Sequence, residues 1–349
     1  MARGKSSGKA TITDVAALAG VSVAAVSKVI NGKSGISEPT RQRVLAAAGK
    51  LQWSPSAAAV ALRGARTRAL GMVVSRAADL LTADPHFALL ISGIERELAP
   101  LDYGLLLHIV GEEPEAEVRA YRRLAEERRV DGVILTESRI GDPRFDLVRG
   151  LKLPAVLVGR PWRADPVPHV QAPGQEAGLR EAIRHLVELG HRRIAYVAGP
   201  EDRVHSSFRR RTVESCLAGH GLAPSHLVVA DFSARDAAAA VERFTGPGAQ
   251  RPTAVLFAND TMAVAGISAA RRRGLEVPRD LSVIGYDDLP LGEIVHPRLT
   301  TVNQDIVQLG RAAAAELLRQ LGENPAEEVA APRPPRLVVR ESTGPARAG

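Results

Sequence analysis

Two patterns of hydrophobic and polar positions divide this 349-residue sequence. Between residues 11 and 53, apolar side chains recur at helical spacing in three short stretches separated by polar and glycine positions. From residue 69 onward, short and almost continuous apolar runs alternate with amphipathic stretches of helix length. The pattern predicts a small all-α domain followed by a larger α/β domain.

The first two helical stretches have the spacing of a helix-turn-helix. We expect Thr13 to cap a first helix in which Val15 and Leu18 share the buried face. Gly20 is expected to end that helix, and Ser22 is expected to cap a second one. In a helix-turn-helix, the second helix enters the major groove of DNA.

A third helix is expected after Ser37, with Pro39 in its first turn. Its buried face is expected to consist of Val44, Leu45, Ala48 and Leu51. A three-helix bundle without a DNA-binding role has similar apolar spacing. The pattern by itself therefore leaves both interpretations open.

The larger region carries eight apolar runs that favour buried strands. They are residues 70–74, 103–110, 131–135, 154–159, 193–199, 227–230, 253–258 and 281–286. Continuous apolar strands separated by helices are typical of parallel sheets covered on both faces. This length suits two doubly wound lobes, which bind ligands beyond the carboxyl ends of their strands.

Two motifs in the first part of the chain resemble the lactose-repressor (LacI/GalR) family. DVAALAGVSVAAVSKVING, residues 14–32, is similar to the helix-turn-helix of that family, and LQWSPSAAAVALRGART, residues 51–67, is similar to its hinge. The resemblance implies a basic disordered arm over residues 1–10, a DNA-binding headpiece over 11–53 and a hinge helix with its linker over 54–68.

The resemblance continues through the larger domain. LGHRRI at residues 189–194, VIGYDD at 283–288 and LTTV at 299–302 are similar to later signatures of the family. It implies that residues 69–349 form a two-lobed effector-binding and dimerisation domain with parallel sheets, like periplasmic sugar-binding proteins. The expected fold is therefore an all-α headpiece and hinge helix joined to an α/β sensor domain.

The resemblance also implies which residues contact DNA. They are Thr11, Ser22, Val23, Ala24, Ser27, Lys28, Asn31, Ser56, Ala59 and Leu62. The chain departs from the family at Ala25, Lys28 and Ser56, where Thr, Arg and Asn are usual. Lys lacks the bidentate fork with which Arg binds guanine, so the resemblance does not transfer an operator sequence.

The hinge segment has a physical logic of its own. Its alanine-rich stretch favours a helix, but about eight residues are too few for a stable isolated one. DNA or a second hinge would therefore have to order it. The resemblance implies that Leu62 is a wedge that enters the minor groove and kinks the duplex. The alternative is a linker leucine that packs on Trp53.

Candidate effector residues come from the same resemblance. They are Phe87, Arg203, Arg209, Asn259 and Asp287. Arg and Asp together can hold vicinal hydroxyl groups, which favours a sugar or a sugar derivative. For Asp287 the alternative is a solvated turn. Gly159 and Gly174, which stand where relatives can carry acids, and a long 76–83 segment leave the particular ligand open.

The distribution of charged residues also distinguishes the two regions. Residues 1–68 carry eleven Lys and Arg side chains against two carboxylates, Asp14 and Glu38, a net charge of +9. The whole chain has a net charge of +7, so the remainder carries −2. A basic domain joined to a nearly neutral one is typical of a protein that binds the phosphate backbone. A basic solubilising tail is the alternative.

Composition narrows the function classes. Cys216 is the single cysteine, which excludes a disulfide framework and cysteine-based zinc clusters. Residues 4–8, GKSSG, match the end of a phosphate-binding loop and a G-x-S-x-G motif, but without the strand that either needs. We therefore expect no enzyme, metal site or cofactor. The basic N-terminus is unlike a secretory signal, so a cytoplasmic protein without a membrane partner is expected.

The leading hypothesis is a homodimeric or tetrameric transcriptional regulator, a repressor that binds a near-palindromic DNA operator under the control of a small-molecule effector. Two alternatives remain. One is a sugar-binding transport component, against which the basic headpiece and missing signal argue. The other is an architectural DNA binder with no effector response. Effector identity, operator sequence and the direction of the response stay open.

Overall fold

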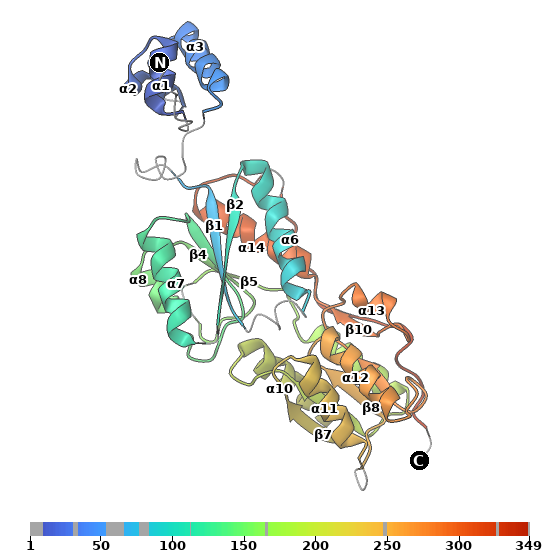
Figure 1. Ribbon diagram of the computed structural model, residues 1–349. Helices are drawn as coiled ribbons and strands as arrows, with labels where there is room; N and C mark the ends of the chain where they lie inside the picture. The colour runs from blue at the N-terminus through green and yellow to red at the C-terminus, as the bar shows by residue number, and fades with distance from the viewer. Residues whose placement is uncertain are drawn as a thin grey trace, which may run out of the picture. The chain divides into compact units, whose positions relative to one another are not determined.

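The computed structural model describes residues 10–30, 34–53, 66–76, 84–111, 113–164, 167–246, 250–325 and 328–347. The chain divides into two compact units, Met1–Thr67 and Arg68–Gly349 (Figure 1). Each unit has its own hydrophobic core. The expected all-α headpiece and α/β domain with parallel sheets are confirmed, whereas the expected hinge helix falls on residues 54–65, outside the described residues.

The first unit contains three helices, α1 (Ile12–Ala19), α2 (Val23–Ile30) and α3 (Glu38–Lys50). The axes of α1 and α2 are bent by 102° across the turn at Gly20, which has a left-handed φ of 66°. The Oγ atom of Ser22 accepts a hydrogen bond from the Ala25 amide at 3.2 Å, so the expected cap of α2 is confirmed. These features form the expected helix-turn-helix.

Three details of this unit differ from the prediction. Thr11, not Thr13, caps α1, and it forms a capping box with Asp14. Leu18 is 51% exposed. The buried face of α1 consists of Val15, Ala16 and Ala19, and Leu18 lies outside this face, beyond its edge at Val15. Leu45 is 52% exposed for the same reason, since α3 buries Val44, Ala47 and Ala48.

No single helix among the described residues is long and apolar enough to cross a bilayer. The bent pair α1 and α2 passes the same test by length and composition only.

The second unit contains two parallel sheets and one short antiparallel pair. The first sheet has the strand order β2-β1-β3-β4-β5, and the second has the order β7-β6-β8-β9. The strands of the first sheet are β1 (Ala69–Ser75), β2 (Gly104–Val110), β3 (Gly132–Leu135), β4 (Ala155–Val158) and β5 (His169–Val170). Those of the second are β6 (Ile194–Ala198), β7 (His226–Val229), β8 (Ala254–Phe257) and β9 (Ser282–Ile284). All eight expected strands are present, and β5 was not foreseen.

Helices cover both faces of each sheet. In the first lobe they are α6 (His86–Leu98), η1 (Ala99–Leu101), α7 (Pro114–Glu126), α8 (Arg144–Gly150) and α14 (Ile306–Gln320). In the second lobe they are α9 (Ala177–Glu188), α10 (Val204–Ala218), α11 (Ala234–Phe244), α12 (Asp260–Arg272) and α13 (Leu291–Ile294). Alternate residues of β1 serve opposite faces: Met72 packs under α6 and α14, whereas Val73 packs toward α7.

The chain passes between the lobes three times. It leaves the first lobe after β5, returns from β10 (Thr301–Asn303) into α14, and leaves again toward β11 (Arg336–Val338). The two short strands pair with each other and pack on α9, whereas α14 packs on α6 in the first lobe. Three connections that pass between the lobes allow each lobe to keep its core while the space between them changes.

The contact between α6 and α14 depends on two glycines. A Cβ atom at Gly93 would overlap the carbonyl oxygen of Val307, and one at Gly310 would overlap that of Leu90.

Gly93→Ala is therefore expected to lower the free energy of unfolding by about 1–3 kcal/mol, the usual cost of overpacking. Urea unfolding measures this. Gly150→Ala, at the end of α8, is the matched control, because a Cβ there has no described atom within 4 Å; an equal loss in both variants would contradict the packing explanation.

Candidate functional site

One candidate site is the outer face of α2. Val23, Ala24 and Lys28 are exposed on it, and Ser27 is half-buried. Val26 and Val29 of the same helix are buried against α1 and α3, which fixes the rotation of the helix. The helix therefore presents one hydroxyl group, one ammonium group and two small apolar side chains to solvent.

The other predicted DNA contacts have different outcomes. Thr11 is exposed, but its hydroxyl group donates a 2.7 Å hydrogen bond to the Asp14 carboxylate and accepts one from the Asp14 amide. The hydrogen bonds from Thr11 lower the pKa of Asp14. Four further predicted contacts lie outside the described residues, as do arm residues 1–9 and hinge residues 54–65: Asn31, Ser56, Ala59 and Leu62.

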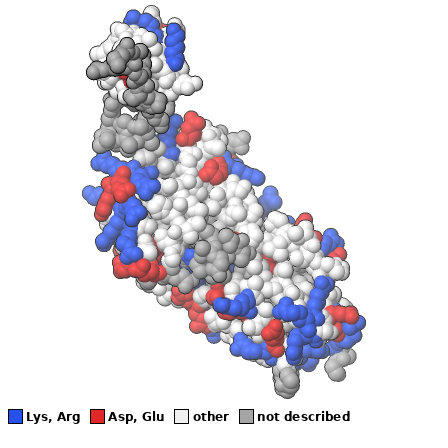
Figure 2. All heavy atoms as spheres, viewed as in Figure 1, with Lys and Arg blue, Asp and Glu red and all other residues white. Residues whose placement is uncertain are grey.

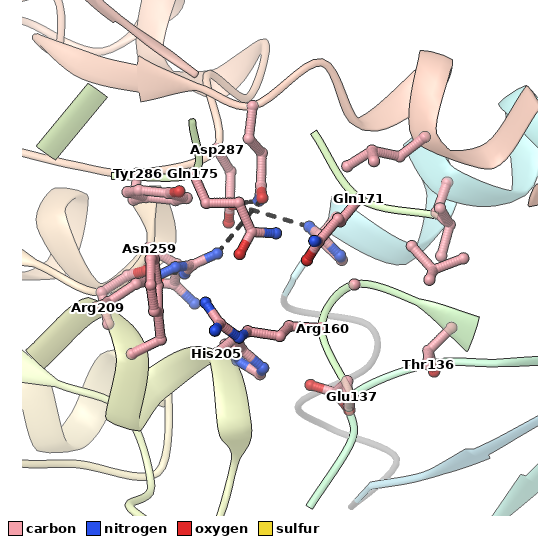
Figure 3. Close-up of a pocket in the computed structure, with 18 of the residues that line it drawn as sticks. Thr136, Glu137, Arg160, Gln171, Gln175, His205, Arg209, Asn259, Tyr286 and Asp287 are labelled. Atoms are coloured by element: carbon pink, nitrogen blue, oxygen red, sulfur yellow. Dashed lines mark hydrogen bonds and ion pairs between the residues drawn. The ribbon is translucent and has the colours of Figure 1, made fainter. Parts of the chain in front are cut away.

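The second candidate site is a cavity between the two lobes of the larger unit. It is partly open to solvent, and the space available to the centres of water-sized molecules is about 120 Å³. The first lobe contributes residues that follow β1, β3 and β4, and the second contributes α10 together with residues that follow β8 and β9. Side chains from both lobes point toward the same space (Figure 3). This is the position at which parallel sheets bind ligands.

Arg209, on α10, lies in the cavity wall as the sequence predicts. Its guanidinium group lies 3.7 Å from the centre of the Tyr286 ring. It donates hydrogen bonds to the carbonyl oxygen of Ala258 at 3.1 Å and to the side chain of Gln304 at 3.4 Å. These contacts hold the guanidinium plane in one orientation toward the cavity.

Asn259 and Asp287 also line the cavity. Asn259 caps α12 by accepting a hydrogen bond from the Met262 amide at 2.8 Å, and its side-chain amide donates to Asp84 of the first lobe at 3.4 Å. Asp287 follows β9 in a left-handed conformation with φ of 118°. Its carboxylate accepts a hydrogen bond from Gln304 and is 94% buried, so it is not part of a solvated turn.

Phe87 and Arg203 are not among the described residues that line the cavity. Phe87 is 3% exposed and belongs to the core under α6, because the first turn of that helix faces the sheet. Arg203 precedes α10 and donates to the carbonyl oxygen of Glu137 at 3.4 Å. Both residues instead help to position the wall.

Sequence reasoning missed a buried ion pair in the wall. Arg76, directly after β1, donates to both carboxylate oxygens of Glu137, which follows β3. Burial opposes ionisation of Glu137, but the charge of Arg76 outweighs it and lowers the pKa of Glu137 to about 2. The feature of the sequence that could have indicated this pair is that each residue closely follows a predicted strand.

Two histidines of the cavity have pKa values that are shifted in opposite directions. Burial and the positive charges of Arg209 and Arg76 lower the pKa of His205 to about 3, so its ring is neutral. For His86, burial opposes protonation, but contact with Asp287 outweighs it and raises the pKa. The His86 ring lies 3.8 Å from the Asp287 carboxylate, across the space between the lobes. No local pattern distinguishes His205 in the sequence from the other scattered histidines.

No group of three or more potential ligand side chains that could hold a metal ion occurs among the described residues. His191 is buried and hydrogen-bonded to Ser282 and Thr253, so its role is structural.

Both units match known protein families. Residues 11–56 match the family model described as bacterial regulatory proteins, lacI family, and residues 183–343 match a periplasmic binding protein-like domain. The HTH-type transcriptional repressor PurR of Aliivibrio fischeri strain MJ11 is 34% identical over 95% of this chain and 98% of its own length. The HTH-type transcriptional regulator DegA of Bacillus subtilis strain 168 is 32% identical over 97% and 99%.

Solved structures agree with these matches. The lac repressor dimer bound to operator and the anti-inducer ONPF aligns with a TM-score of 0.83 at 29% identity, over 97% of this chain and all of that one. The complex of the transcriptional regulator CelR with cellobiose aligns with a TM-score of 0.69 at 32% identity, over 95% and 99%. With a helix-turn-helix, a two-lobed sensor fold and relatives matched over almost their whole length, the chain is a DNA-binding transcriptional regulator and belongs to the lacI family of bacterial regulatory proteins.

Proposed function

We propose that this chain is a repressor that binds a near-palindromic operator as a homodimer, and that a sugar or sugar derivative in the interlobe cavity changes its affinity for DNA. The observation that carries the proposal is the presence of a helix-turn-helix and a polar interlobe cavity in one chain. The lac repressor dimer with operator and ONPF, and CelR with cellobiose, support it by similarity.

DNA reading is assigned to the outer face of α2. Lys28 can reach a guanine edge or a phosphate, and the hydroxyl group of Ser27 can hydrogen-bond to either kind of base pair. Val23 and Ala24 offer apolar contacts that suit the methyl group of thymine. Two copies related by a twofold axis would read two half-sites, which is why the operator is expected to be near-palindromic.

The hinge contacts remain part of the proposal. Ser56, Ala59 and Leu62 would contact the minor groove, with Leu62 as the wedge, and Thr11 and Asn31 would contact the backbone at the ends of the helix-turn-helix. The compartment follows from the proposed partner: a regulator of bacterial operators works in the cytoplasm.

Effector control is assigned to contacts that join the lobes across the cavity. Asn259 of the second lobe donates to Asp84 of the first, and His86 faces Asp287. At the rim, the Ile140 amide donates to the carbonyl oxygen of Asp202 at 2.8 Å. A ligand bound among these groups replaces or reinforces the contacts and so favours one separation of the lobes. Because the lobes are joined to the DNA-binding unit through the hinge, ligand and DNA affinities become coupled.

The experiment is selection of bound sequences from a random DNA pool by the full-length protein, followed by a screen of sugars against the selected site. We expect a near-palindromic consensus and at least one sugar or sugar derivative that changes its affinity. Failure to bind any DNA would favour the transport component. DNA binding without sequence preference or response would favour the architectural protein.

A further inference from the structure

The interlobe cavity has an excess of hydrogen-bond donors at its wall. Arg76 is only 8% exposed, and its buried Nη1 atom lies 3.8 Å from Asp84 Oδ2, within ion-pair distance but with no hydrogen-bond partner among the described residues. The hydroxyl group of Ser138, in the same wall, is also buried without one. Because burying a polar atom without a hydrogen-bond partner is costly, such atoms point to a ligand or water that completes their hydrogen bonds.

Two further guanidinium groups reach the cavity from opposite lobes. Arg160 follows β4 in the first lobe, and Arg209 belongs to α10 in the second. Figure 3 shows Arg160 beside His205, on the same side of the cavity as Arg209. Each guanidinium group is held over an aromatic ring, that of Arg160 over Phe208 at 5.2 Å and that of Arg209 over Tyr286. Among the described residues neither group is within ion-pair distance of a carboxylate.

The carboxylates of the wall already have partners. Both oxygens of Glu137 accept from Arg76. Asp84 accepts from the His86 amide through one oxygen and from Asn259 through the other. Asp287 accepts a hydrogen bond from Gln304 through Oδ1. Of the six carboxylate oxygens of these three residues, only Asp287 Oδ2 has no hydrogen bond within the described part of the chain.

A neutral polyol matches this wall less well, because its hydroxyl groups carry no charge to offset the two guanidinium groups that lack a carboxylate partner. A carboxylate or phosphate group accepts several hydrogen bonds and donates none. We propose that the effector is an anionic sugar derivative, whose acidic group binds at Arg160 and Arg209 while a hydroxyl group donates to Asp287. This inference rests on the proposed function and names the ligand class for the same cavity.

The electrostatics at His205 support this position of the acidic group. His205 lines the cavity, and its ring stacks on Phe232 at 5.8 Å. Burial, together with the charges of Arg209 and Arg76, lowers the pKa of this residue. The same positive potential that disfavours a proton on His205 favours an anion beside it.

The test compares matched neutral and anionic sugars on the full-length protein. The probes are glucose, glucuronate and glucose 6-phosphate, with the corresponding galactose set, and inorganic phosphate as the control for a free anion. Calorimetry gives the dissociation constants, and the two acidic arms separate a carboxylate ligand from a phosphate ligand. Each probe is also added to the protein on its selected operator.

The variants are Arg160→Gln and the matched control Arg163→Gln. Arg163 lies three residues away and pairs with Asp146 at 2.9 Å, outside the cavity lining. In the wild-type protein, one acidic sugar is expected to bind at least about tenfold more tightly than its neutral partner, as charge-assisted hydrogen bonds imply. Arg160→Gln is expected to remove most of this preference, and Arg163→Gln to retain it.

Three outcomes would count against the proposal. Equal or tighter binding of the neutral sugars would overturn it and leave the proposed function intact. An unchanged preference in Arg160→Gln would overturn the placement of the acidic group. If neither kind of sugar binds or alters operator affinity, the sugar effector of the proposed function fails as well.

Discussion

Arg209→Ala and Asp287→Ala are expected to abolish the response of operator binding to the effector while leaving operator affinity within about twofold of wild type. Each side chain lines the cavity, and each substitution would remove the proposed charge-assisted hydrogen bond to the ligand. That loss costs about 1.5–3 kcal/mol, or roughly a tenfold to hundredfold increase in ligand Kd. The DNA-binding unit has its own core and contains neither residue, so its helices are not altered. Calorimetry with the effector and operator titrations measure the two effects.

The controls separate ligand contact from misfolding. Asp287→Asn keeps the shape of the side chain and tolerates the left-handed backbone at this position, so it should fold even if the alanine variant does not. Asp146→Ala removes a carboxylate from the surface of the first lobe, where its side chain is 63% exposed, and should respond normally. A normal response in Arg209→Ala and in both Asp287 variants would mean that the effector binds elsewhere.

Lys28→Ala is expected to weaken binding to the selected operator by roughly fivefold to tenfold. This is about 1 kcal/mol, the lower end of the cost of a lost base contact, because Lys cannot make the bidentate contact of Arg. The ammonium group is exposed on α2, whose buried Val26 and Val29 fix which side chains face outward. Binding to unrelated DNA should fall much less, because it depends on many phosphate contacts. Fluorescence anisotropy with specific and unrelated duplexes measures both.

Lys50→Ala is the matched control for charge. Lys50 ends α3 and is exposed, so the substitution removes the same charge from the same unit. Its effect should be small and similar on both kinds of DNA. If the two lysine variants weaken specific and unrelated binding alike, α2 does not read the sequence.

The sequence predicts the layout of the fold because buried parallel strands leave a plain signal. Runs such as residues 70–74 and 253–258 are almost entirely apolar, since helices cover both faces of each strand. The strands β5, β10 and β11 were missed because they are only two or three residues long and include polar positions. Their pairing is set by neighbours distant in the chain, not by a local pattern.

The cavity was partly foreseen. Arg209, Asn259 and Asp287 meet there, as the family resemblance implies, although their contact with an effector remains a prediction. Arg76 and Glu137 were missed because a charged residue after a strand looks the same in sequence whether it is solvated or buried in an ion pair. Only the parallel pairing of β1 with β3 brings their carboxyl ends together.

The helix phases show a similar limit. Spacing alone placed Leu18 and Leu45 in the headpiece core, but both side chains are about half exposed. Small alanines on the adjacent side of each helix allow closer packing and rotate the buried face away from the leucines. Local periodicity gives the helix, whereas the packing partner sets its rotation.

The coupling between the two units is tested most directly by a closed set of binding measurements on the wild-type protein. Operator affinity is measured with and without saturating effector, and effector affinity is measured with and without saturating operator. The account predicts that both ratios differ from one by the same factor, about fivefold or more, because coupling between two sites is reciprocal. Ratios of one in both directions, with each ligand still binding, would contradict control of DNA binding from the interlobe cavity.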